Sequence, residues 1–196
     1  MKSTNQSIIE VQKDSNPIQV LASEKISMEY SVFLYDEIIS PSDFIEAVQV
    51  AKMASEEDVI NIYINSPGGS LDAVDMFLMA LDETPAKVRA IVGGTCASAA
   101  TLVLLKADEY EISPNASIMF HSASFNVGGQ HSQVVDHISH VSERCETLLR
   151  NSYSGIFSEE EIEQMIRGKE FWLTPQQFIE RINKVNGLTE EATVTE

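Results

Sequence analysis

Residues 59–81 have the sequence VINIYINSPGGSLDAVDMFLMAL, and this stretch decides the fold of the chain. Its first six residues are mostly β-branched or aromatic, which predicts a buried strand. The NSPGG turn at residues 65–69 ends that strand, because Pro and Gly interrupt regular structure. A helix is predicted from Ser70 until Pro85, with apolar positions at Leu71, Val74, Met76, Phe77, Met79 and Leu81.

The same alternation extends outward on both sides of this stretch. Apolar runs predict further strands at residues 31–35, 88–92, 110–112 and 117–120. Helices are predicted to carry the apolar positions of residues 44–51, capped by Ser42 or Asp43, and of residues 96–106. Strands that alternate with helices predict crossover connections, and therefore an α/β fold with a parallel sheet.

The last third of the sequence has a different character. Residues 122–130 are predicted to be loop or extended chain, and a long amphipathic helix is predicted over about 131–152. Two further helices are predicted to begin near Ser158 and Thr174, where capping-type sequences occur.

Length and charge limit the class of protein. The 196 residues suit one domain, here residues 29–196, preceded by a polar arm at residues 1–28. The net charge is −17 with only 13 Lys and Arg, which argues against nucleic-acid partners and against anionic membranes. The polar N-terminus predicts no secretory signal, and two cysteines predict no disulfide framework. We therefore expect a cytoplasmic protein.

Ser98 is a candidate nucleophile because of its position in GGTCASAA, residues 93–100. A strand, a glycine turn and a helix of small residues place a side chain at a helix start, where backbone N–H groups favour developing negative charge. A serine there acts as a nucleophile if a base reaches it. Taken alone, the same serine is better explained as a helix cap, because Ser is common at helix starts.

His121 is the candidate base. It directly follows the predicted strand at residues 117–120, and sites in parallel sheets are built at the carboxyl ends of strands. The alternative is a structural histidine. The glycine turn at residues 65–69 offers backbone N–H groups to a ligand, although it lacks the Lys-Ser/Thr of a phosphate loop. His137 and His140 have a spacing that suits a metal, but no ligand cluster accompanies them, so no metal or cofactor is predicted.

Together these segments resemble the Clp protease proteolytic subunit family. The resemblance rests on YINSPGGS, GTCASAA, SIMFH and EFWLTPQQF, at residues 63–70, 94–100, 117–121 and 170–178, and it covers about residues 31–190. It implies a crotonase-like α/β fold, built as a repeated ββα superhelix with a protruding strand–helix handle at about residues 122–155. It also implies rings of seven subunits, often stacked as two rings, and an ATPase unfoldase of the Hsp100 type as partner.

The resemblance also assigns roles to residues. It places the nucleophile at Ser98 and the general base at His121, with oxyanion-hole donors at the backbone N–H groups of Gly69 and Ala99. The third member of the triad falls on Glu170, where the family has Asp. The implied activity is that of a serine endopeptidase that cleaves short peptides or unfolded chains inside a closed chamber.

The sequence is also compatible with other functions. One is a catalytically weak or inactive ring component, suggested by two departures from the family, Glu170 in place of Asp and Phe171 in place of an Arg that ties two rings together. Others are a dedicated processing protease, such as one that matures a capsid, and a crotonase-type acyl-CoA enzyme. Cys96 is not expected to be the nucleophile, because it lies where the motif has a packed small residue.

Overall fold

A six-stranded, mostly parallel sheet organises the computed structural model, which describes residues 27–187. Along the sheet the strands run β1 (Glu29–Ile38), β2 (Val59–Gly69), β3 (Lys87–Ala97), β5 (Ser117–Phe120) and β6 (Phe171–Leu173), and β4 (Glu109–Ile112) pairs with β3. The pairs are parallel except that β5 and β6 are antiparallel. The predicted α/β class with a parallel sheet is confirmed, while the arm predicted at residues 1–28 lies almost wholly outside the described residues.

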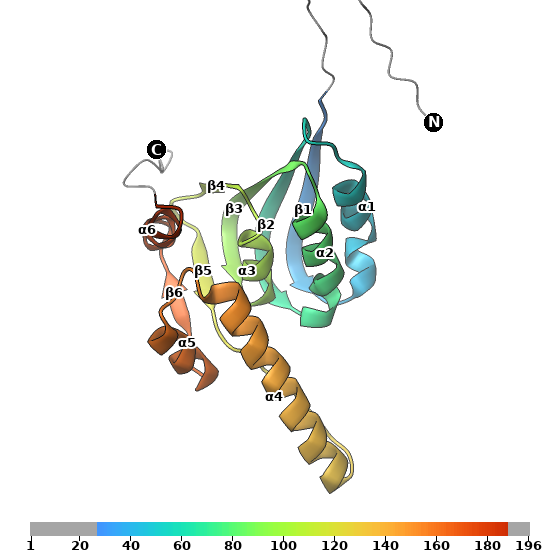
Figure 1. Cartoon of the computed structure of the whole chain (residues 1–196), viewed down its shortest axis with the longest axis vertical. Helices are drawn as coiled ribbons and strands as arrows, with labels where there is room; N and C mark the ends of the chain where they lie inside the picture. Colours follow the sequence, from blue (N-terminus) through green and yellow to red (C-terminus); the bar gives the residue numbers. More distant parts are fainter. Residues whose placement is uncertain (1–26, 188–196) are drawn as a thin grey trace, which may run out of the picture.

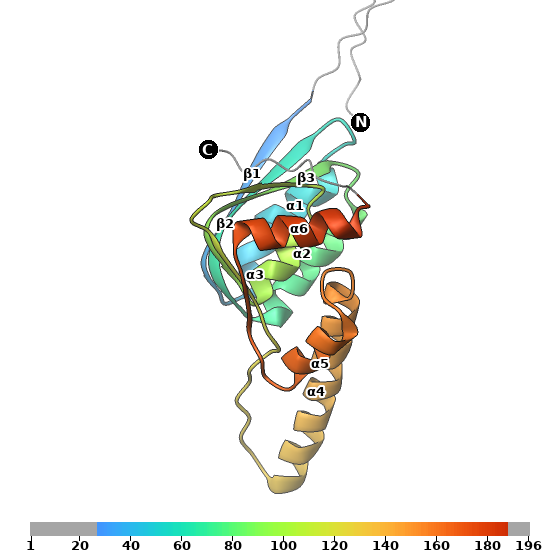
Figure 2. The same cartoon turned by 90° about the vertical axis from the view of Figure 1, so that its left-hand side faces the viewer.

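Helices cover one face of the sheet (Figures 1 and 2). They are the short 3-10 helix η1 (Pro41–Phe44), α1 (Ile45–Met53), α2 (Leu71–Glu83) and α3 (Ala99–Leu104). Between the layers, Ile60, Ile62 and Ile64 of β2 are almost completely buried, and the rings of Phe44 and Phe77 stack 5.2 Å apart. Burial of these side chains is the main force that holds the helices to the sheet.

A long helix, α4 (His131–Tyr153), projects from the body of the protein, and residues 121–130 run beside it (Figure 2). This pair of segments is the handle. Residues 121–130 form no strand, because within residues 27–187 they pair with no neighbouring strand. After the handle, α5 (Glu159–Ile166) and α6 (Pro175–Val185) begin at the caps Ser158 and Thr174, as predicted. No helix in residues 27–187 is long and apolar enough to cross a membrane.

Two strands continue beyond the glycines that were predicted to end them. The strand predicted at residues 88–92 extends to Ala97, and the helix predicted from Cys96 begins only at Ala99. The reason is tertiary, since Cys96 pairs with Ile118 of β5. Likewise β2 extends to Gly69, which pairs with Ile38 of β1.

Smaller corrections concern caps and exposed residues. The first helical turn is capped by Ser40 in a capping box with Asp43, not by Ser42 or Asp43. Met76 and Met79 of α2 are 51% and 56% exposed, because the buried stripe of that helix contains Val74, Phe77, Leu78 and Leu81 instead. The strand β6 was not predicted, since three residues carry too little periodicity to be recognised.

An ion pair ties α5 to α6. The guanidinium of Arg181 donates to both carboxylate oxygens of Glu161, at 2.7 and 3.1 Å, and also to the carbonyl oxygen of Ile156. The backbone N–H of Ser158 donates to the same carboxylate at 2.9 Å. The hydrogen bonds from Arg181 are the main reason that the pKa of Glu161 is lowered to about 2.

This ion pair predicts a pH-dependent stability. A lowered pKa favours the folded state above the pKa of the unfolded chain, 4.5, and the benefit is lost as the pH falls towards 2. We expect Glu161→Gln to lower the free energy of unfolding by about 2 kcal/mol at pH 7, and by less as the pH drops below 4.5. Urea titrations at several pH values measure this, with Glu160→Gln as the matched control. If Glu161→Gln lowered the free energy of unfolding by the same amount at every pH, the ion pair with Arg181 would not be the cause.

Candidate active site

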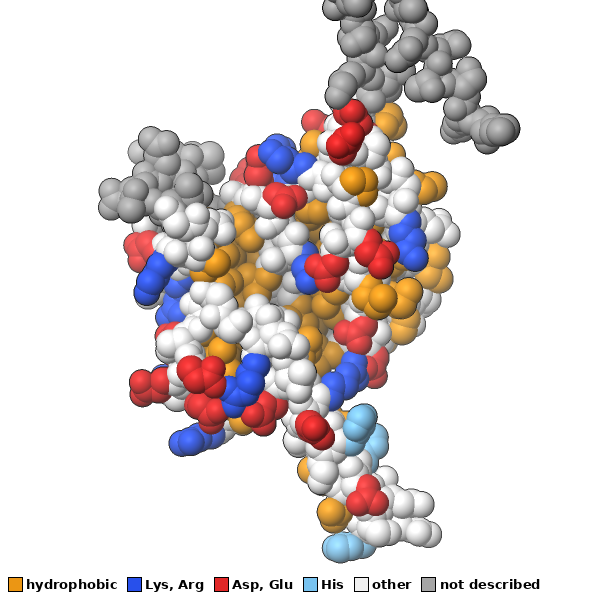
Figure 3. All heavy atoms as spheres, in the orientation of Figure 1, with side chains coloured by type: hydrophobic (Ala, Val, Ile, Leu, Met, Phe, Trp, Pro, Cys, Tyr) orange, Lys and Arg blue, Asp and Glu red, His pale blue; other side chains and the backbone are white. Residues whose placement is uncertain are grey.

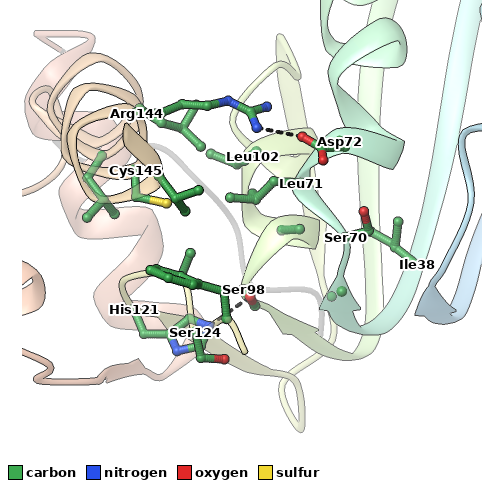
Figure 4. Close-up of a pocket in the computed structure, with 18 of the residues that line it drawn as sticks. Ile38, Ser70, Leu71, Asp72, Ser98, Leu102, His121, Ser124, Arg144 and Cys145 are labelled. Atoms are coloured by element: carbon green, nitrogen blue, oxygen red, sulfur yellow. Dashed lines mark hydrogen bonds and ion pairs between the residues drawn. The ribbon is translucent and has the colours of Figure 1, made fainter. Parts of the chain in front are cut away.

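Ser98 and His121 form a hydrogen-bonded pair. The Oγ of Ser98 lies 2.7 Å from the Nε2 of His121, although the two residues are 23 positions apart (Figure 4). Ser98 directly follows β3 and His121 directly follows β5, and these strands are parallel neighbours. Their carboxyl ends therefore deliver the two side chains to one edge of the sheet, as the sequence predicted.

The backbone of Ser98 is held in a rare conformation. Its φ of 54° and ψ of −128° lie where non-glycine residues are uncommon. Its N–H donates to the carbonyl oxygen of Met119 at 2.9 Å, and its own carbonyl oxygen accepts from the Thr101 hydroxyl at 2.6 Å. Such a conformation costs about 1–3 kcal/mol, and it persists because the surroundings fix it. The result is a sharp strand-to-helix turn that exposes the hydroxyl.

Gly68 and Gly69 bring the end of β2 against this turn. Gly68 has φ of +89°, and a Cβ placed on it would lie 2.7 Å from the Cβ of Ser98 and 2.8 Å from the backbone nitrogen of Ala99. The N–H of Gly68 donates to the Ser66 hydroxyl at 3.1 Å. The N–H of Ser70 donates to the carbonyl oxygen of Ile38 of β1, and Gly69 itself pairs with Ile38, so the end of β2 is also held against β1.

Two residues of the NSPGG turn hold the site together in ways that sequence reasoning missed. Asn65 accepts through Oδ1 from the N–H of Thr95 at 3.0 Å, which joins the two glycine-containing turns. Ser66 is fully buried and donates to the carbonyl oxygen of Asp36 at 2.6 Å. Asp36 has φ of 68° and lies at a bulge in β1. Only the polar character of the turn residues hinted at these contacts.

The C-terminal end of α4 contacts the turn that contains Ser98 through Thr101. The Tyr153 hydroxyl lies 2.8 Å from the Oγ1 of Thr101, whose proton is already given to the carbonyl oxygen of Ser98. Tyr153 is therefore the donor in this contact. Burial raises the pKa of Tyr153 to about 12, so its hydroxyl keeps its proton at neutral pH.

A cavity of about 840 Å³ opens beside the Ser–His pair. Gly68, Gly69, Ala99 and His121 line it, so the two residues expected to supply oxyanion donors border the same cavity as Ser98. Its far wall is apolar and comes mainly from α3 and α4, with Leu102, Cys145, Leu148 and Leu149. Above that wall, Arg144 of the handle pairs with Asp72 at 2.5 Å and with Asp75 at 2.6 Å (Figure 4).

Glu170 lies near His121, but its carboxylate is bound elsewhere. In the antiparallel pair of β5 and β6, Met119 faces Trp172 and Phe120 faces Phe171. Continuing this register places Glu170 directly across from His121. Its Oε2, however, accepts a hydrogen bond from the Nε1 of Trp172 at 2.9 Å. The described residues provide no hydrogen-bond partner to the Nδ1 of His121.

The two cysteines and the histidines of α4 take no part in the contact between Ser98 and His121. Cys96 is fully buried in β3, and burial raises the pKa of its thiol well above the usual value, which disfavours the nucleophilic thiolate. Cys145 is also a free, buried cysteine. The histidines of α4 lie out on the handle (Figure 3), and residues 27–187 contain no cluster of three or more metal-binding side chains.

The fold and the hydrogen-bonded pair of Ser98 and His121 together define a class of protein. A mostly parallel α/β sheet that presents a hydrogen-bonded serine and histidine at its carboxyl edge has the arrangement used by serine hydrolases. The family model described as Clp protease matches residues 9–181. The chain belongs to the Clp protease family, which is a family of serine peptidases and has the crotonase-like fold.

Individual relatives are distant. The chain is 35% identical over 132 residues to the ATP-dependent Clp protease proteolytic subunit 3 of Nocardia farcinica, covering 63% of the chain and 55% of the relative. It is 31% identical over 150 residues to proteolytic subunit 2 of Mycobacterium tuberculosis, covering 71% and 65%. The matched part therefore spans a little over half to about two thirds of these relatives.

The close approach of Gly68 to Ser98 yields a prediction. A methyl group at position 68 would collide with the Cβ of Ser98 and with the carbonyl oxygen of Ala97. We expect Gly68→Ala to displace Ser98, to lower the free energy of unfolding by about 2–3 kcal/mol and to weaken any reaction of Ser98 at least tenfold. Gly93→Ala is the matched control, since its Cβ would meet nothing within 4 Å. Equal behaviour of the two variants in urea unfolding and Ser98 labelling would refute the steric argument.

Proposed function

We propose that this chain is a serine endopeptidase with Ser98 as nucleophile and His121 as general base. The observation that carries the proposal is the 2.7 Å contact between the Oγ of Ser98 and the Nε2 of His121. A base within hydrogen-bond reach is what converts a weakly nucleophilic hydroxyl into an attacking group. The membership of the Clp protease family supports the same assignment.

The reaction follows from the positions of these groups. Ser98 attacks the peptide carbonyl carbon while His121 takes the hydroxyl proton, and the carbonyl oxygen becomes an oxyanion. The imidazolium then returns the proton to the leaving amine as the C–N bond breaks, which leaves an acyl-serine. Water, deprotonated by His121, attacks that ester and releases the carboxylic acid product.

The backbone N–H groups of Gly69 and Ala99 are the proposed oxyanion donors. Ala99 directly follows the proposed nucleophile, and Gly69 is the last residue of β2. Both residues line the cavity that contains Ser98. Donors fixed in the backbone stabilise the transition state strongly because they need no reorganisation when charge develops.

Glu170 is the proposed third member of the triad. Its position across from His121 in the register of β5 and β6 supports this role, because facing residues on antiparallel strands have Cβ atoms about 5 Å apart. A carboxylate there can accept from the Nδ1 of His121, fix its tautomer and stabilise the imidazolium. In the present conformation the Oε2 of this carboxylate accepts from Trp172 instead.

The proposed substrates are short peptides and unfolded chains. We propose that seven subunits form a ring, single or stacked, that encloses the active sites in the cytoplasm and receives substrates from an Hsp100-type ATPase. The family and the names of the relatives, ATP-dependent Clp protease subunits, support this assembly. Mass measurement of the native assembly tests the stoichiometry. A dedicated processing protease would use the same catalytic groups.

One observation favours a second candidate, a catalytically weak or inactive ring component. The Glu170 carboxylate is bound to Trp172 instead of His121, so the triad is incomplete in this conformation. Serine, histidine and oxyanion donors alone still support slow chemistry. The two candidates therefore differ in rate at Ser98, which an active-site probe measures.

A fluorophosphonate probe tests the proposal, because it reacts only with an activated serine. We expect labelling of Ser98, lost in Ser98→Ala and reduced at least a hundredfold in His121→Ala, with cleavage of unstructured peptides following the same order. Ser139→Ala, on the exposed face of α4, is the matched control and should label like the wild type. Absence of both labelling and cleavage in the assembled protein would reject the peptidase and favour the inactive component.

A further inference from the structure

Trp172 occupies an unusual place beside the catalytic pair. It is the single tryptophan of the chain, it is 58% exposed, and it faces Met119 across β5 and β6. Residues alternate between the two faces of this strand pair, so Ile118, Phe120 and Leu173 are buried in the core. Met119 and Trp172 lie on the opposite face, which His121 and Glu170 continue. Trp172, Glu170 and His121 therefore share one face of the sheet.

The indole of Trp172 donates to the Glu170 carboxylate, whereas the imidazole of His121 does not. The Nε1 of Trp172 donates to Glu170 at 2.9 Å, which is a well-formed hydrogen bond. The Nδ1 of His121, on the facing strand, has no partner among residues 27–187. Glu170 is exposed, so its side chain is free to change rotamer without breaking the core. A change of rotamer of this one side chain would move the carboxylate relative to the facing His121.

We propose that Trp172 is a positioning residue that holds Glu170 away from His121 in the resting enzyme. In this state His121 is hydrogen-bonded to Ser98 but lacks its orienting carboxylate. When the imidazole takes the serine proton it becomes a cation, and a charge-assisted bond to a carboxylate is about twice as strong as one from a neutral indole. The reaction itself therefore draws Glu170 from Trp172 to His121, and breaking the indole bond adds to the barrier.

This inference rests on the proposed function and adds to it a restraint on catalysis, the hydrogen bond from Trp172 to Glu170, which we call the brake. The brake acts on the chemical step and not on substrate binding, because neither Glu170 nor Trp172 lines the cavity beside Ser98. Its removal should therefore raise kcat and leave KM unchanged. A residue with a merely structural role would instead lower activity, or change it independently of Glu170.

Trp172→Phe tests the brake, since it keeps an aromatic ring and removes only the N–H donor. We expect kcat for peptide cleavage, and the rate of fluorophosphonate labelling, to rise about threefold to tenfold, the factor that one ordinary hydrogen bond supplies. Glu170→Gln is the second arm. Adding Trp172→Phe to Glu170→Gln should give no further rise, because the carboxylate that the indole restrains is already gone.

The single tryptophan also gives a direct signature in the wild-type protein. Phosphonylation of Ser98 should shift the fluorescence emission of Trp172 as Glu170 leaves the indole, and this shift should be absent in Glu170→Gln.

An unchanged or lower kcat in Trp172→Phe, or an equal gain with and without Glu170, overturns the brake. If neither wild type nor Trp172→Phe labels at Ser98, the peptidase proposal fails and the brake fails with it. Labelling of the wild type without acceleration in Trp172→Phe rejects the brake alone.

Discussion

The close contact between the end of β2 and the turn after β3 is the constraint on which the rest of the site depends. Gly68 lies so near Ser98 that no side chain fits between them, and Ser98 itself has a backbone conformation that only a rigid frame maintains. Three strands supply that frame, because Met119 of β5 binds the N–H of Ser98 while Asn65 of β2 binds that of Thr95. The nucleophile is thus fixed by backbone contacts more than by its own side chain.

The parallel and antiparallel parts of the sheet contribute differently to the proposed active site. Parallel strands end at one edge, so they place Ser98, Gly69 and His121 together with little freedom. Glu170 comes from the loop before the short antiparallel strand β6, at the border of the sheet and exposed to solvent. Its side chain is consequently the adjustable part of the site, and Trp172 is the neighbour that holds it.

Sequence reasoning recovered the parts of the structure that depend on local pattern. The alternation of strands and helices predicted the parallel sheet, and a serine at a helix start together with a histidine directly after a strand predicted the pair that Ser98 and His121 form. It missed features that only tertiary pairing creates, such as the continuation of β3 through Gly93 and Gly94 to pair with β5. The partner of the Glu170 carboxylate was equally out of reach, because the rotamer of an exposed side chain decides which donor it meets, and a sequence pattern does not encode that rotamer.

Two successive hydrogen bonds, from Tyr153 to Thr101 and from Thr101 to the carbonyl oxygen of Ser98, connect the handle to the turn that contains Ser98. Tyr153 is the last residue of α4, and α4 is a 23-residue rod whose far end projects from the body (Figure 1). At 1.5 Å per residue such a rod is about 35 Å long. The buried root of this rod is therefore joined by two successive hydrogen bonds to the carbonyl oxygen of Ser98. One helix thus spans the distance from the Ser98 turn to the far end of the handle.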